Sequence, residues 1–186
     1  LLLVLTVCDI RAVGPNVWNG WKAALLRQLY NAAEQVLSGG TLAGGRADRI
    51  RQIQAEVAKR LASWSDKEKD EHFARGYAPY WLSFDPDSLA RQAELVRGAA
   101  RSRPPLAIEH RVDAARSVTE VTIYTLDTHG LFARLAGAMA VSGANIVDAK
   151  IFTLANGMAL DTFWIQDLEG KPFDDPQRLA RLSARV

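Results

Sequence analysis

The chain has 186 residues, of which 48% are hydrophobic, so it can bury one large core or two small ones. Its formal net charge of +2 is too small to indicate nucleic-acid binding, and its basic residues are spread along the sequence. The one cysteine, Cys8, excludes an internal disulfide framework and is consistent with a reducing, cytoplasmic compartment. The apolar residues 1–5 are far fewer than the roughly 20 that span a membrane, so we expect no membrane association.

The first two-fifths of the chain predicts helices. Residues 1–12 are apolar nearly all round, which predicts a buried helix, cut from a larger parent domain, with Cys8 as a small core residue. Asn16 or Asn19 can cap a second helix. Its expected inner stripe is Trp18, Trp21, Leu25, Leu29, Ala32 or Ala33, and Val36.

Three further helices follow from spacing and capping signals. Apolar residues at intervals of three and four mark the third, at Ile50, Ile53, Val57, Leu61 and Trp64. Ser65 and Glu68 form a capping-box signature for a short fourth helix. Asp85-Pro86 starts a fifth, which directs Leu89, Ala93 and Val96 inward and closes at residues 103–105.

The remaining residues alternate strands and helices. Residues 106–112 and 119–126 alternate apolar and polar side chains, which predicts neighbouring strands. Residues 131–141 have helical spacing with Leu131, Leu135, Ala138 and Met139 on one face. Asn145 opens the next strand, Asn156-Gly157 predicts a hairpin, residues 158–166 a third strand, and Asp175-Pro176 a last helix. The order from residue 119 is β-α-β-β-α, a ferredoxin-like βαββαβ unit without its last strand.

Gly130 is the centre of a candidate ligand site. It allows a sharp turn, and the helix that follows offers N–H groups and a positive dipole end to a carboxylate. The alternative is that Asp127 and Gly130 only form a turn and a cap. Spacing alone supports the two equally.

This half of the chain resembles the ACT domain family of regulatory modules that usually bind amino acids. The resemblance rests on Asp127, Gly130 and Leu131 (D-x-x-G-L), on Ala-Asn-Ile at 144–146, and on the hairpin before A-L-D-T-F-W-I. It implies a ligand between the first loop, the start of the first helix and the second strand, and possible self-association, for which Phe163 or Trp164 could mark an interface. The implied ligand-binding residues are Asp127, His129, Gly130, Leu131, Asn145, Ile146 and Val147.

Asp9 is the candidate metal ligand. A carboxylate inside an apolar helix is costly to bury without a partner, so a salt bridge to Arg11 or Lys22, or a helix-end cap, is the simpler explanation. The longer string LTVCDIRAVGPNVWNGWKAALLRQLY, however, resembles the closing segment of the HD-type hydrolase domain in bacterial bifunctional PII uridylyltransferase/uridylyl-removing enzymes. The resemblance places the last ligand of the HD metal site on Asp9. Cys8 stands where the family more often has Ala.

The two resemblances occur in the order found in that family. They imply an α+β chain in which residues 1–104 are the helical end of the HD domain with connecting helices, and residues 105–186 a truncated ACT domain. The implied parent moves UMP from UTP to the PII signal protein, removes it by hydrolysis with a divalent metal (Mg or Mn), and senses glutamine. The alternative is a non-enzymatic amino-acid-binding module on a helical scaffold.

The chain itself is expected to be catalytically silent. HD chemistry needs a His, a His-Asp pair and a final Asp around a divalent metal, and the sequence contains no His-Asp dipeptide. His72 is expected at the surface of a charged helix and His110 in a strand, and His129 in the ligand loop.

Overall fold

The computed structural model describes residues 1–14, 17–18, 20–37, 45–102 and 104–185, so the predicted caps Asn16 and Asn19 lie outside it. The side chains of Ala32 and Val36 are also outside the described part of the chain. The elements are α1 (Leu2–Val13), α2 (Gly20–Leu37), α3 (Arg46–Arg60), α4 (Asp66–Phe73), α5 (Ala78–Trp81), α6 (Pro86–Ser102), β1 (Leu106–Asp113), β2 (Val118–Leu126), α7 (Leu131–Val141), β3 (Asn145–Lys150), β4 (Met158–Gln166) and α8 (Pro176–Arg185).

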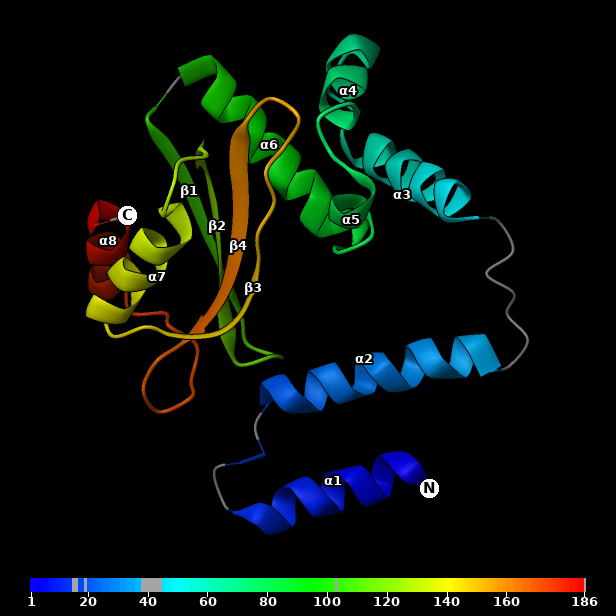
Figure 1. The fold of residues 1–186 in the computed structure, drawn as a ribbon, viewed down its shortest axis with the longest axis vertical. Coiled ribbons are helices and arrows are strands. Elements are labelled where there is room, and N and C mark those ends of the chain that lie inside the picture. The colour runs from blue at the N-terminus through cyan, green and yellow to red at the C-terminus, as the bar shows by residue number, and fades with distance from the viewer. Residues whose placement is uncertain (15–16, 19, 38–44, 103, 186) are drawn as a thin grey trace.

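A four-stranded antiparallel sheet lies between two layers of helices (Figure 1). Its strand order is β1-β2-β4-β3, and α7 and α8 cover one face. The other face packs against α6, and α3 and α5 pack behind it. This arrangement confirms the α+β class with a ferredoxin-like unit after a helical part.

β1 confirms the predicted strand beside β2. It pairs in register from Leu106 opposite Thr125 to Asp113 opposite Val118. Leu106 and Ile108 pack toward α7 and α8, whereas Ala107 packs toward α6, as alternation requires.

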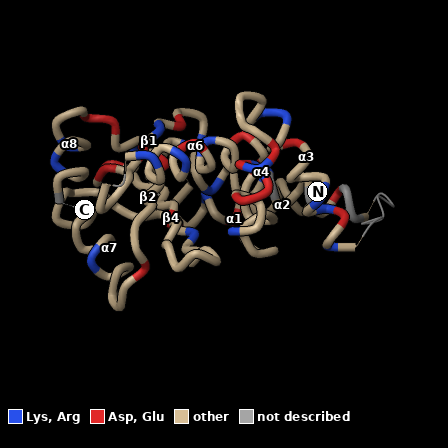
Figure 2. The backbone as a smooth tube through the Cα atoms, turned by 90° about the horizontal axis from the view of Figure 1, so that it is seen from above, with Lys and Arg blue, Asp and Glu red and all other residues tan. Residues whose placement is uncertain are grey.

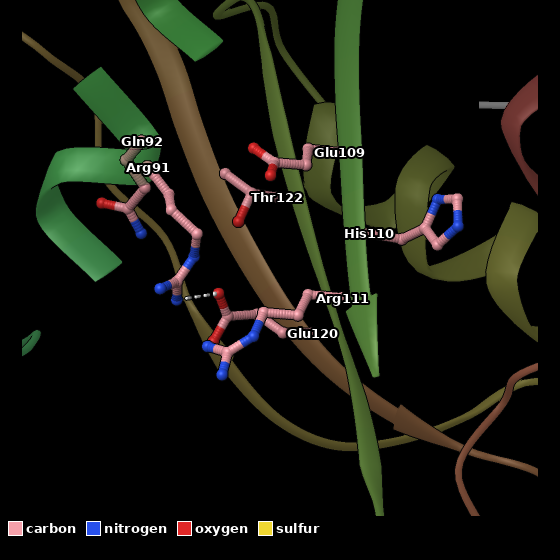
Figure 3. Close-up of a pocket in the computed structure, with 7 residues that line it drawn as sticks. All are labelled: Arg91, Gln92, Glu109, His110, Arg111, Glu120 and Thr122. Atoms are coloured by element: carbon pink, nitrogen blue, oxygen red, sulfur yellow. Dashed lines mark hydrogen bonds and ion pairs between the residues drawn. The ribbon is translucent and has the colours of Figure 1, made fainter. Parts of the chain in front are cut away.

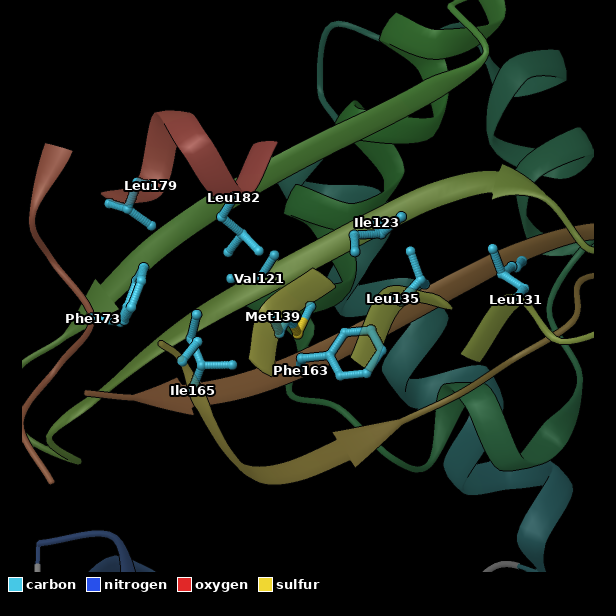
Figure 4. Close-up of a cluster of buried hydrophobic side chains, with 12 residues drawn as sticks. Val121, Ile123, Leu131, Leu135, Met139, Phe163, Ile165, Phe173, Leu179 and Leu182 are labelled. Carbon is cyan, nitrogen blue, oxygen red and sulfur yellow. The ribbon is translucent and has the colours of Figure 1, made fainter. Parts of the chain in front are cut away.

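The first hydrophobic core lies between the sheet and the α7–α8 layer (Figure 4). The strands contribute Val121, Ile123, Phe163 and Ile165, and α7 contributes Leu131, Leu135 and Met139 from its predicted stripe. Phe173, Leu179 and Leu182 close the core from the C-terminal side.

The second core joins the helices to the opposite face of the sheet. Leu89, Ala93 and Val96 are fully buried on α6, as predicted, and they share this core with Tyr124 of β2 and Leu160 of β4. Residues on both sides of the expected 104/105 boundary therefore pack together, and the division into two domains stays a prediction.

Capping chemistry confirms two predicted helix starts. The Ser65 hydroxyl accepts a hydrogen bond from the Glu68 backbone, and the Glu68 carboxylate accepts one from the Ser65 backbone at 2.9 Å. At α6, the Asp85 carboxylate accepts a hydrogen bond from the Ser88 N–H at 2.9 Å. Both caps satisfy N–H groups that the helix cannot satisfy internally.

The prediction of a buried first helix is wrong for the described chain. α1 has no buried residue, and Leu2 is 78% exposed. Of the α2 stripe, Trp21 is buried, whereas Leu25 and Leu29 are exposed. The reason is that the described elements supply no second layer over these two helices, so their apolar faces meet solvent.

Two side chains expected at the surface are buried. His72 is 2% exposed, because it points from α4 into the rings of Trp64, Phe73 and Trp81. Burial there lowers the pKa of His72 to about 4. One of Phe163 and Trp164 was expected to be exposed, yet both are buried, because helices cover both faces of the sheet.

The surface carries both signs of charge. Lys and Arg alternate with Asp and Glu along the described chain rather than gathering in one segment (Figure 2). Within the described residues, no helix is both long enough and apolar enough to span a membrane.

Candidate ligand-binding site

The β2–α7 loop is fixed to the β3–β4 turn by hydrogen bonds. The Asp127 N–H donates to the carbonyl of Gly157 at 3.2 Å. From the other side, the Thr153 hydroxyl donates to Asp127 Oδ2 at 2.5 Å. These contacts hold the Asp127 carboxylate at the end of the sheet where β2 stops.

Gly130 sets the start of α7. Its φ of 74° and ψ of 10° are left-handed, a conformation that a residue with a Cβ adopts at a cost of about 1–2 kcal/mol. The Thr128 carbonyl accepts a hydrogen bond from the Leu131 N–H at 3.0 Å, which closes the turn. After Leu131, the next N–H groups of α7 have no carbonyl one turn earlier in the helix, so the start of α7 is a favourable place for an anionic group.

Asp161 is the second carboxylate of the site. It lies on β4, is 1% exposed, and its Oδ1 accepts a hydrogen bond from the Phe152 N–H at 3.3 Å. Burial chiefly, together with the nearby negative charge of Asp127, raises the pKa of Asp161 to about 6. Two carboxylates on one cavity favour a ligand with a cationic group.

The cavity between these groups has a volume of about 200 Å³. That is below the roughly 300–1,000 Å³ of typical drug-sized pockets, so it suits a molecule the size of an amino acid. It is lined by Asp127, Thr128, Gly130, Leu131, Phe132, Ile151, Thr153, Ala159 and Asp161. The sequence predicted Asp127, Gly130 and Leu131, and the structure brings these together.

Sequence reasoning missed six of the lining residues, among them Ile151, Thr153 and Asp161. Asp161 left a signal, because an aspartate inside the apolar run of β4 is costly and uncommon in strands. Ile151 and Thr153 follow β3, where nothing in the local sequence indicates a site.

Asn145, Ile146 and Val147 do not reach this cavity within one chain. Asn145 pairs with Gln166 at one end of β4, whereas Leu126, which precedes the loop, pairs with Met158 at the other. Met158 and Gln166 are the two ends of the nine-residue strand β4, a distance of ~26 Å. His129 is exposed and is not among the residues that line the cavity.

A second hollow lies between α6 and the β1–β2 hairpin (Figure 3). Arg91 of α6 pairs there with Glu120 of β2, with 3.4 Å between Nη2 and Oε1. Glu109 and Arg111 project to the same side of β1, whereas His110 projects to the opposite side. The cavity holds about 10 Å³, the room for one water molecule, so it cannot take a larger ligand.

Asp9 lies on α1 and is exposed, contrary to the expectation that it faces the interior. Among the described residues, no group of three or more His, Cys, Asp or Glu side chains could hold a metal ion. A divalent site needs several ligands, so the described residues do not complete one around Asp9.

Curated relatives align with the whole chain. The bifunctional uridylyltransferase/uridylyl-removing enzyme of Azospirillum brasilense is 54% identical over 187 residues, which cover 100% of this chain and 20% of that enzyme. The enzymes of the same name from Gluconobacter oxydans and Rhodospirillum rubrum are 46% and 44% identical with the same coverage. Over its whole length, the chain therefore matches a segment of the bifunctional uridylyltransferase/uridylyl-removing enzymes.

The match to this uridylyltransferase/uridylyl-removing family covers both halves of the chain, with Asp9 in the first and the Asp127 cavity in the second. The chain spans about a fifth of the length of these relatives. No family model matches it.

Proposed function

We propose that this chain is the part of a bifunctional uridylyltransferase/uridylyl-removing enzyme that binds a small amino acid and passes the signal to the hydrolase. The observation that carries the proposal is the cavity between Asp127, Asp161 and the start of α7. Its carboxylates suit the α-amino group of an amino acid, and the helix start suits the α-carboxylate. Glutamine is the proposed ligand, and the module is proposed to be an ACT domain.

The proposed parent reaction is transfer of UMP from UTP to the PII signal protein and its hydrolytic removal. The names of the relatives support the two activities, and the high identity over the whole chain supports the same parentage here. The proposed cofactor is a divalent metal, Mg or Mn, which would activate water for the removal step when bound. Asp9 would give one ligand to the HD-type metal site. The chain by itself is proposed to be catalytically silent, and the proposed location of the parent enzyme is the cytoplasm.

The Asn145 segment is proposed to act between copies. β3 is an edge strand, so its outer side can meet another ACT unit. Self-association would then bring Asn145, Ile146 and Val147 of one unit toward the loop of another, with His129 beside it.

A non-enzymatic binding module would need the same cavity but gives Asp9 no role. The relatives are named as enzymes, which favours the first proposal.

Asp9→Asn in the full-length enzyme tests the metal assignment. We expect UMP removal to be abolished and UMP transfer to stay near the wild-type rate, because the amide is a much weaker metal ligand than the carboxylate. Asp70→Asn, at an exposed position of α4, is the control and should change neither rate. Equal loss of both activities, or of neither, would refute the role of Asp9.

A further inference from the structure

α2 meets the sheet through an aromatic junction, which consists of Trp21, Phe84, Trp164 and the cation of Lys150. Trp21 of α2 and Trp164 of β4 are both buried, with ring centroids 6.0 Å apart. Phe84, in the α5–α6 loop, has its ring centroid 6.2 Å from that of Trp164. The junction therefore joins three segments that are distant in sequence.

Lys150 inserts its charge into this aromatic junction. Its Nζ lies 4.7 Å from the Phe84 ring centroid and 5.3 Å from that of Trp164. The same nitrogen donates a hydrogen bond to the Ser83 carbonyl. A half-buried cation over two aromatic rings is attracted to both ring faces.

The first turn of α2 is fitted closely to the β1–β2 turn. A Cβ on Gly20 would lie 2.9 Å from the Ser117 hydroxyl and 3.5 Å from the Arg116 carbonyl oxygen. The contact at Trp21 is thus one of two adjacent close contacts between α2 and the sheet.

The aromatic junction is continuous with the ligand cavity. Lys150 is followed by Ile151, Phe152 and Thr153, of which Ile151 and Thr153 line the cavity. The Phe152 ring lies on the junction side, 6.0 Å from the Phe84 centroid. Residues 150–153 therefore have the cavity on one side and the aromatic junction on the other.

The contacts that hold residues 152 and 153 use the same oxygens that a ligand amine would need. The Thr153 hydroxyl binds Asp127 Oδ2, and the Phe152 N–H binds Asp161 Oδ1. An ammonium group entering between the two carboxylates competes for both acceptors. Ligand binding therefore has a direct means of displacing residues 152 and 153.

We propose that the aromatic junction, in which Lys150 packs on Trp164 and Trp164 packs on Trp21, is the link through which the ligand cavity regulates the segment that carries Asp9. This inference rests on the proposed function. α1 carries Asp9 and precedes α2 in the chain. A movement of Trp21 is therefore transmitted through the start of α2 to the segment that carries Asp9. Coupling of this kind is reciprocal, and its usual size is about a 5–150-fold change in affinity.

The test uses the full-length enzyme and L-glutamine. Lys150→Gln removes the cation at similar size, and Lys150→Arg keeps it. Lys171→Gln is the matched control, because the ion pair described for Lys171 is with the neighbouring, exposed Glu169. Both uridylyl transfer and uridylyl removal are measured against glutamine concentration, and glutamine affinity is measured by calorimetry.

We expect Lys150→Gln to reduce the glutamine-dependent change in the removal rate at least about five-fold, the lower end of the usual range of coupling. Both basal rates should stay near wild type, Lys150→Arg should recover most of the response, and Lys171→Gln should keep all of it. A wild-type response in Lys150→Gln would overturn the inference. If the wild-type enzyme neither binds nor responds to glutamine, the proposed function fails and the inference fails with it.

Gly20→Ala tests the same link from the α2 side and guards against misfolding of the Lys150 variant. The added methyl must displace Ser117, so we expect the same loss of response with glutamine binding retained. Gly98→Ala is the control, because a Cβ there meets nothing within 4 Å. A full response in Gly20→Ala would also overturn the inference.

Discussion

Replacing Asp161 by Asn should make the protein more stable and its ligand binding weaker. In the folded chain, the pKa of Asp161 rises from 3.8 to about 6, chiefly because of burial. A shift of about 2 pKa units corresponds to about 3 kcal/mol, which is the most that ionising Asp161 can cost the folded state.

The pH dependence follows from the direction of this shift. The folded state holds the Asp161 proton more tightly than the unfolded chain does. The stability linked to Asp161 is therefore fully present below about pH 3.8 and is lost as the pH rises to about 6. The amide of the Asp161→Asn variant cannot ionise and can still accept the hydrogen bond from the Phe152 N–H, so the variant avoids this loss.

The assay is urea unfolding of the 186-residue chain between pH 3.5 and 8, followed by tryptophan fluorescence. The free energy of unfolding of Asp161→Asn minus that of the wild type should grow between pH 4 and 6 and then stay constant. Asp174→Asn, at an exposed position, should show no such rise. A difference that does not change with pH would refute the assigned burial of the charge.

The same substitution should weaken glutamine binding to the full-length enzyme at pH 7 by at least about tenfold, because hydrogen bonds to charged groups contribute about 1.5–3 kcal/mol. A variant that is more stable but binds less well would identify Asp161 as a ligand-binding residue rather than a structural one. Unchanged affinity would remove Asp161 from the site.

Two smaller predictions concern the backbone. Gly130→Val should lower the free energy of unfolding by at least about 1 kcal/mol, because Gly130 has a left-handed φ, and should weaken glutamine binding in the full-length enzyme. Gly137→Ala is the control and should not change the free energy of unfolding, since a Cβ there also meets nothing within 4 Å. Thermal unfolding and calorimetry check both variants, and unchanged glutamine affinity in Gly130→Val would place the sensor elsewhere. Ser65→Ala should lower the free energy of unfolding by about 1 kcal/mol, because it removes the capping box of α4. Ser102→Ala should leave that free energy nearly unchanged in the same assay, and equal effects of the two substitutions would contradict the assigned cap.

Local signals in the sequence were sufficient for most of the secondary structure. The stripe at Leu131, Leu135 and Met139, the capping box at Ser65 and the turn at Gly157 each depend on neighbours within a few residues. The resemblance to known families was also confirmed for the uridylyltransferase/uridylyl-removing enzymes, because it rested on strings that span both halves of the chain.

The errors arose where distant residues decide the outcome. The apolar composition of residues 1–12 suggested that α1 is buried, but burial needs a covering layer that the described residues do not provide. The charged sequence around His72 hid an aromatic enclosure formed by Trp64 in the α3–α4 turn, Phe73 of α4 and Trp81 of α5. Strand register, which no local pattern fixes, separates Asn145 from the Asp127 loop.

The helical layer formed by α3, α5 and α6 limits how this sheet can assemble. In a sheet with one bare face, two copies can stack face to face. Here both faces are occupied, and Trp164, which could have marked such an interface, is buried within its own chain. Around the described residues, the surfaces left open to a second unit are the outer edges of β1 and β3, where the sheet can extend sideways, and the outside of the helices.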